Sequence, residues 1–133
     1  MRGGLVIALA VIAVTSLPLS AHHGSAAYES GKTVTLKGTV KSWAYLNPHC
    51  LLTLEVKGDD AKVVQWLVET QAPGIMFPAG YRKDSFKAGD DVTVVATPLK
   101  NGLPVGHIVS VVTASGWTLG GGGNDVAIPP KNK

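Results

Sequence analysis

Apolar and polar residues alternate with a period of two along most of this chain, while the 3.6-residue period of an amphipathic helix is almost absent. Successive side chains of a β-strand point to opposite faces, so this alternation is typical of strands that bury one face. In the segment 33–43, for example, Val34, Leu36 and Val40 fall on one face and threonines and lysines on the other. The pattern therefore predicts an all-β fold.

Five segments carry this alternation, and turn residues such as Gly58-Asp59-Asp60 separate them. The expected strands are residues 33–43, 50–56, 62–69, 92–97 and 107–113. Gly38 lies on the inward face of the first segment, where it predicts a bend or a bulge.

Between the third and fourth segments lies a short irregular apolar stretch, Ile75-Met76-Phe77, which we expect to form a capping helix or turn. The OB-fold, a partly open five-stranded barrel, has this order of elements: three strands, a short capping element and two further strands. The sequence therefore predicts an OB-like β-barrel, and the alternative is a small β-sandwich.

The amino terminus has the three parts of a signal peptide, namely Arg2, an apolar run over residues 5–14 and small residues up to Ala21. The run is shorter than the roughly 20 apolar residues that span a bilayer. We therefore expect cleavage after Ala21, export to the periplasm or the medium, and no stable membrane insertion afterwards. Residues 22–119 would then form the barrel, and residues 120–133, rich in Gly and Pro, a flexible tail.

Charge and cysteine content limit the partners of the exported domain. Arg2 is the one charged residue in the expected signal peptide, so 11 of the 12 basic residues remain beside 9 acidic ones, a net charge of +2. No basic cluster in the globular part is longer than Arg82-Lys83, and this argues against nucleic acid. Cys50 is the sole cysteine, so no internal disulfide can form. We expect the Cys50 side chain to be buried like a small apolar residue. We also expect the protein to be a monomer.

Several short motifs resemble a known family. They are His22-His23, Thr35-Leu36-Lys37-Gly38-Thr39-Val40, Asn47-Pro48-His49, Trp66 with Glu69, and Asp84-Ser85-Phe86-Lys87-Ala88-Gly89-Asp90. Together they are similar to the small secreted bacterial proteins of domain of unknown function family 6152, over residues 22–119. The resemblance implies export and a compact β-domain, and it implies no particular activity.

The histidines carry the main chemical hypothesis. Cleavage after Ala21 would leave His22 with a free α-amine, which can lose its proton to a metal ion at low cost. The amine and the imidazole of His22 could chelate one ion, and His23, His49 and His107 could add further imidazoles. Nitrogen-rich ligation suits copper(II), and less selectively zinc or nickel. The alternative is that the new terminus is solvated and that His49 donates to a backbone carbonyl. If His107 points inward with Val109 and Val111, it is a core or rim histidine.

No catalytic motif is evident. A Gly-x-Ser-x-Gly elbow is absent, and His49 and Cys50 are adjacent in a predicted strand, where they would point to opposite faces and form no dyad. A binding or accessory role is therefore favoured over catalysis. Trp43 and Tyr45, near a strand end, are the candidates for contacting a carbohydrate, a peptide or another small molecule. A third possibility is an accessory subunit that docks to an exported redox enzyme or another envelope protein.

Overall fold

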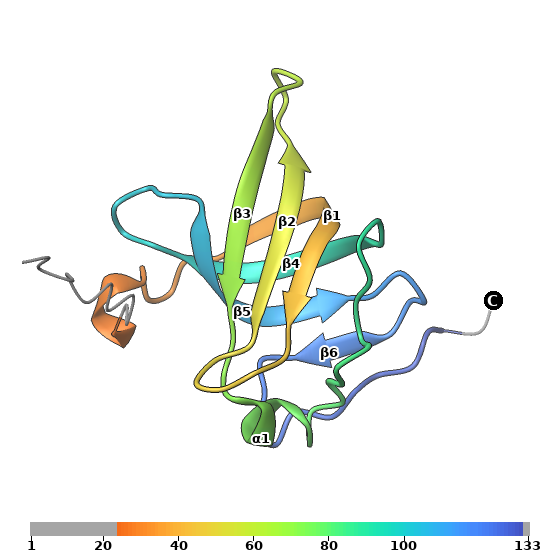
Figure 1. The fold of residues 1–133 in the computed structure, drawn as a ribbon. Coiled ribbons are helices and arrows are strands. Elements are labelled where there is room, and N and C mark those ends of the chain that lie inside the picture. Colours follow the sequence, from red (N-terminus) through yellow and green to blue (C-terminus); the bar gives the residue numbers. More distant parts are fainter. Residues whose placement is uncertain (1–23, 132–133) are drawn as a thin grey trace, which may run out of the picture.

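Each of the five alternating segments forms a strand in the computed structural model, which describes residues 24–131 (Figure 1). The strands are β1 (Val34–Ala44), β2 (Leu51–Lys57), β3 (Val63–Glu69), β4 (Asp91–Pro98) and β5 (Val105–Val112), followed by the short β6 (Thr118–Gly120). The helix α1 (Pro73–Met76) and the 3₁₀ turn η1 (Ser25–Ala27) complete the elements. The all-β prediction is confirmed.

The sheet closes into a barrel because its two distant strands β3 and β5 also pair with each other. The strand order is β3-β2-β1-β4-β5-β6, and β3 pairs with β5 in parallel, with Leu67 opposite Val105 and Glu69 opposite His107. The helix α1 lies between β3 and β4 at one end of the barrel, where Met76 is buried (Figure 1). The five-stranded barrel with a short cap between its third and fourth strands is therefore confirmed, and β6 is an extra strand.

Gly38 is needed for a close approach of strands and not for a bulge. It pairs in register with Val56 of β2 and Val92 of β4. A Cβ atom at this position would lie 2.9 Å from the backbone oxygen of Glu55, closer than real side chains come. The register of β1 against β2 shifts between Val40 and Ser42 instead. Of the predicted bend or bulge, the bulge is therefore not found at Gly38.

The chain continues to contact the barrel beyond residue 119, where the expected domain boundary lies. Gly120 belongs to β6, and its carbonyl oxygen accepts a hydrogen bond of 2.7 Å from the hydroxyl of the buried Tyr81. Ile128 exchanges two backbone hydrogen bonds, of 2.9 and 2.8 Å, with Thr118. The Gly-rich segment thus returns along β6, a pairing that its composition does not reveal.

The expected signal peptide, residues 1–21, and the pair His22-His23 lie outside the described residues. Cleavage and export therefore stay predictions. Within residues 24–131, no helix has the length and apolar character required to cross a membrane.

Candidate functional site

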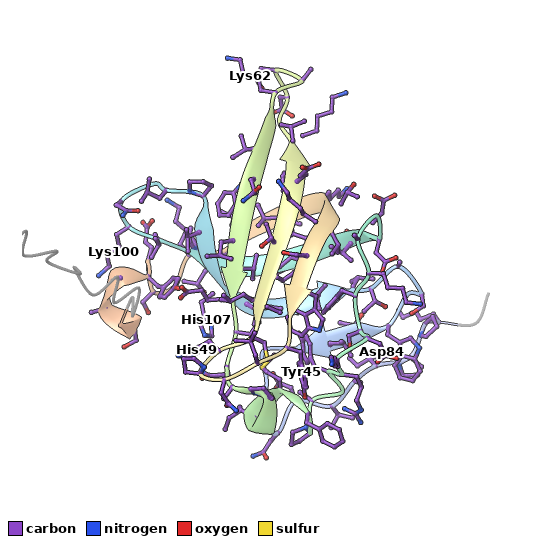
Figure 2. All side chains as sticks on the ribbon, viewed as in Figure 1. Tyr45, His49, Lys62, Asp84, Lys100 and His107 are labelled. Atoms are coloured by element: carbon purple, nitrogen blue, oxygen red, sulfur yellow. The ribbon has the colours of Figure 1, made fainter. Side chains whose placement is uncertain are left out.

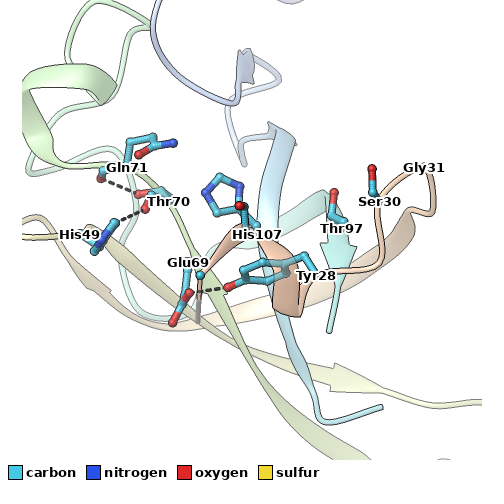
Figure 3. Close-up of a pocket in the computed structure, with 11 residues that line it drawn as sticks. Tyr28, Ser30, Gly31, His49, Glu69, Thr70, Gln71, Thr97 and His107 are labelled. Atoms are coloured by element: carbon cyan, nitrogen blue, oxygen red, sulfur yellow. Dashed lines mark hydrogen bonds between the residues drawn. The ribbon is translucent and has the colours of Figure 1, made fainter. Parts of the chain in front are cut away.

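An open pocket of about 560 Å³ lies where β3 and β5 close the barrel (Figure 3). One wall is the segment that leads into β1, and the others come from the entrance of β2, the end of β3 and the facing residues of β4 and β5. The lining residues are Gly24, Ser25, Tyr28, Ser30, Gly31, His49, Glu69, Thr70, Gln71, Thr97 and His107. Two of the four histidines of the chain therefore share one pocket.

His107 lines this pocket from the outer face of β5, so the alternative in which it points inward with Val109 and Val111 does not apply. Ile108 is buried, whereas Val109 is 41% exposed. The reason is an extra residue in β5: Ile108 pairs with Ala96 and Ser110 with Val95, so that Val109 has no partner in β4. Val111 is buried again beyond this bulge, while His107 is left half-buried at the barrel edge.

His49 lies in the loop before β2 and lines the same pocket as His107 (Figure 2). Its Nδ1 is 2.9 Å from the carbonyl oxygen of Thr70, and Nδ1 of His107 is 3.2 Å from that of Ile108. A carbonyl oxygen can only accept, so both Nδ1 atoms donate, and the neutral imidazoles carry their lone pair on Nε2. Histidines that bind metals typically use this arrangement, with the second nitrogen donating to a carbonyl.

Glu69 and Tyr28 line the pocket and are joined by a side-chain hydrogen bond (Figure 3). The Tyr28 hydroxyl donates a hydrogen bond to Oε2 of Glu69. Burial and this contact with Glu69 raise the pKa of Tyr28, so the phenol stays protonated as a donor. The Tyr28 ring also meets the His107 ring edge to face, with centroids 5.6 Å apart and planes at 75°.

The pocket contains an acidic side chain and no lysine or arginine to balance it. Glu69 is the one carboxylate among the lining residues of the described chain, and neither Lys nor Arg is among them. A carboxylate without such a partner in the same pocket favours a cation over an anion there. Sequence reasoning did not assign Tyr28 or Glu69 to the site. Glu69 ends a strand just before the polar pair Thr70-Gln71, but its pairing with His107 across the closure is a long-range contact.

The described residues contain no complete metal site. Between residues 24 and 131, no group of three or more His, Cys, Asp or Glu side chains could hold a metal ion. Cys50 is fully buried, as expected, and does not line the pocket. Burial raises the pKa of its thiol, which disfavours the thiolate that metals bind. Two imidazoles are therefore present here, and any further strong ligand must come from elsewhere.

Trp43 and Tyr45 lie away from this pocket, in an aromatic cluster with Tyr81 and Phe86. Both are partly buried and pack against the core. Nε1 of Trp43 donates to the carbonyl oxygen of Arg82 at 2.9 Å, and the Tyr45 hydroxyl donates to that of Pro73 at 3.3 Å. These contacts give both residues a structural role, and ligand binding by them stays a prediction.

Residues 8–108 match the family of unknown function DUF6152. The chain belongs to this family. The match covers most of the chain, including Tyr28, His49, Glu69 and His107, and it confirms the resemblance found in the sequence motifs. Searches of the curated proteins and of the solved structures found no match. This member of DUF6152 is thus a small β-barrel domain, and its function must be argued from the pocket.

Proposed function

We propose that this domain is an exported binding module for a divalent transition metal ion, with copper(II) as the first candidate. The observation that carries the proposal is the composition of one pocket. His49 and His107, which are far apart in the sequence, line it together with Gly24, the residue that directly follows His22-His23. The other two histidines of the chain directly precede this lining residue in the sequence.

Chain length supports the participation of the histidine pair. Two residues of extended chain span at most about 7 Å, so His22 and His23 are within reach of a pocket that begins at Gly24. A chain cleaved after Ala21 would add the α-amine and imidazole of His22 and the imidazole of His23 to the two imidazoles of the barrel. This segment would complete the ligand set that residues 24–131 lack.

The chemistry of the ligand atoms determines which metal ion the proposed site prefers. The ligands would be an amine and imidazoles, with the carboxylate of Glu69 nearby to balance charge. Nitrogen donors suit copper(II), and zinc and nickel bind more weakly or less selectively in such a site. Cys50 and Met76, the sulfur-containing side chains of the described residues, are fully buried, so the pocket offers no soft ligand for copper(I).

The first test replaces the two barrel histidines. We expect His49→Asn and His107→Asn each to weaken copper(II) binding by about 10-fold or more, since a lost ligand costs at least as much as the 10-fold to 100-fold typical of an outer-shell partner. Asparagine can still donate near the Nδ1 position to Thr70 or Ile108 but lacks the Nε2 donor. Isothermal titration of the metal-free protein with copper(II) alone gives the affinity, and intact mass confirms that the purified chain begins at His22.

The control for this test is Lys62→Asn, which alters an exposed side chain at the tip of the β2–β3 hairpin, far from the pocket (Figure 2). The proposal predicts one copper ion per chain and an unchanged affinity in this control. It is overturned if the protein that begins at His22 binds no copper(II) at micromolar concentration, or if both histidine variants bind it like the unmodified protein.

A further inference from the structure

Three polar side chains form a row across the strands that close the barrel. Glu69 of β3 pairs with His107 of β5, and Thr97 of β4 pairs with His107 from the other side. Paired residues of neighbouring strands direct their side chains to the same face of a sheet. All three line the pocket of about 560 Å³, so the row forms part of its wall (Figure 3). The row includes neither His22 nor His23 and lies wholly within the described chain.

The pocket is large enough for an organic molecule. Its volume of about 560 Å³ lies within the roughly 300–1,000 Å³ that is usual for small-molecule sites. Neighbouring strands are about 4.8 Å apart, so the row from Glu69 to Thr97, which crosses two such spacings, is roughly 10 Å long. Because the side chains and their hydrogen bonds take up part of this length, a molecule of about the size of one sugar ring can contact both ends.

Glu69 gives one end of the row a negative charge. Its carboxylate accepts a hydrogen bond from the Tyr28 hydroxyl, but a carboxylate has about four lone-pair sites and can accept more. Within residues 24–131, no lysine or arginine forms an ion pair with Glu69. An ammonium group carries three donors and a positive charge, so it would form strong charge-assisted hydrogen bonds at this end.

Hydroxyl groups lie at the other end of the row. Thr97 is its last member, and Ser25 and Ser30, from the segment before β1, line the same pocket. A hydroxyl can both donate and accept, so these side chains suit the hydroxyl groups of a ligand in any orientation. The pocket therefore combines a charged acceptor at one end with neutral hydrogen-bonding groups at the other.

We propose that this pocket binds a small hydroxylated molecule with a primary ammonium group, which is the chemistry of an amino sugar. The ammonium group donates to Glu69, and the hydroxyl groups of the ligand bond to Thr97 and to the serines of the pocket. This ligand class goes beyond the proposed metal function, because its binding uses residues 24–131 alone and requires no metal ion.

The test titrates isotope-labelled protein with three sugars in the presence of a metal chelator and follows the backbone amides by nuclear magnetic resonance. Glucosamine carries the ammonium group, glucose has a hydroxyl in its place, and N-acetylglucosamine has a neutral amide there. We expect glucosamine to shift the amide signals of Glu69, Thr97 and His107. It should bind about 10-fold more tightly than either neutral sugar, because hydrogen bonds between charged groups are the stronger ones.

Variants assign the two ends of the row. Glu69→Gln keeps an acceptor for the Tyr28 hydroxyl and removes the charge, so it should lower the glucosamine affinity about 10-fold and the glucose affinity much less. Thr97→Val removes one hydroxyl and should weaken the binding of both sugars by a few-fold. The matched control is Glu55→Gln, which changes the net charge equally on an exposed side chain of β2 outside the pocket and should alter neither affinity. Unchanged amide signals away from the pocket show that each variant is folded.

The proposal is overturned if millimolar glucosamine shifts no amide signal of the pocket, or if a neutral sugar binds as tightly as glucosamine. Neither comparison needs a variant. It is also overturned if Glu69→Gln binds glucosamine like Glu55→Gln. The proposed metal function is tested separately, by titration with copper(II) alone, so a protein that binds glucosamine in this pattern but no copper(II) would refute the metal function only.

Discussion

Acetylation of the His22 α-amine is expected to weaken copper(II) binding by roughly 100-fold or more, about 2.7 kcal/mol. The modification converts the α-amine into an amide and leaves no other amine at this terminus, so the amine that chelates together with the His22 imidazole is lost. An amine with a pKa near 8 gives up its proton to a metal easily, whereas an amide nitrogen does so only at a higher cost. Intact mass confirms the two forms, and titration with copper(II) measures the difference in affinity.

The control is the same protein taken through the procedure without the acetyl donor, which leaves the amino terminus unchanged. Its affinity should equal that of the untreated protein that begins at His22. Equal affinities for the acetylated and the free amino terminus would instead remove the α-amine from the ligand set. The barrel histidines would then have to hold the metal without it.

Gly106→Ala is expected to destabilise the barrel by about 1–3 kcal/mol, the usual cost of overpacking a core. Gly106 is buried in β5 and pairs with Val68 across the closure. A Cβ atom at this position would lie 2.9 Å from the Cβ of Ala96 and 3.3 Å from the carbonyl oxygen of Thr97. One strand must therefore move, and urea unfolding followed by circular dichroism measures the lost stability.

Two further variants test whether the clash with Ala96 causes the loss of stability. Gly74→Ala is the matched control, because a Cβ atom there would meet nothing within 4 Å, and it should leave stability unchanged or slightly higher. Adding Ala96→Gly to Gly106→Ala removes the clashing methyl group and should restore part of the lost stability. A Gly106→Ala protein as stable as the original would show that β4 and β5 are not in the close contact described here. Since His107 follows directly, a displaced β5 should also weaken copper(II) binding.

The local pattern of the sequence predicted most of the barrel. Alternation placed five strands to within two residues of their observed starts and within one of their ends, because each strand buries one face and exposes the other. The capping helix was predicted from the apolar stretch Ile75-Met76-Phe77 between strands, and the observed helix Pro73–Met76 includes the first two of these residues. Cys50 was expected to be buried because it continues the inward face of Leu52 and Leu54, and all three are fully buried.

The features that the sequence did not predict arise where a distant segment determines the local structure. The bulge at Val109 depends on how β5 pairs with β4, so the sequence alone left the orientation of His107 open. The strand β6 is three residues long, and its pairing with β5 and Ile128 could not be read from a Gly-rich composition. Gly38 permits the close approach of β1 and β2. Glycine occurs both at bulges and at close approaches of strands, and the sequence did not distinguish the two.

The candidate site was predicted only as a set of separate residues. The histidines were selected by residue type, and the structure brings His49 and His107 to one pocket. Tyr28 and Glu69 were missed because their contact joins the segment before β1 to the end of β3, which no sequence spacing indicates. Trp43 and Tyr45 were chosen as aromatic residues near a strand end, where packing against Tyr81 now accounts for Trp43.

The most direct measurement counts the imidazoles bound to copper(II) in the protein that begins at His22, by pulsed electron paramagnetic resonance. The account predicts donors from both parts of the chain, with fewer bound imidazoles in the double variant His49→Asn/His107→Asn than in the unmodified protein. A spectrum that is unchanged in the double variant and identical to that of copper(II) on the free peptide of residues 22–27 would contradict the account, because the barrel would then contribute no ligand.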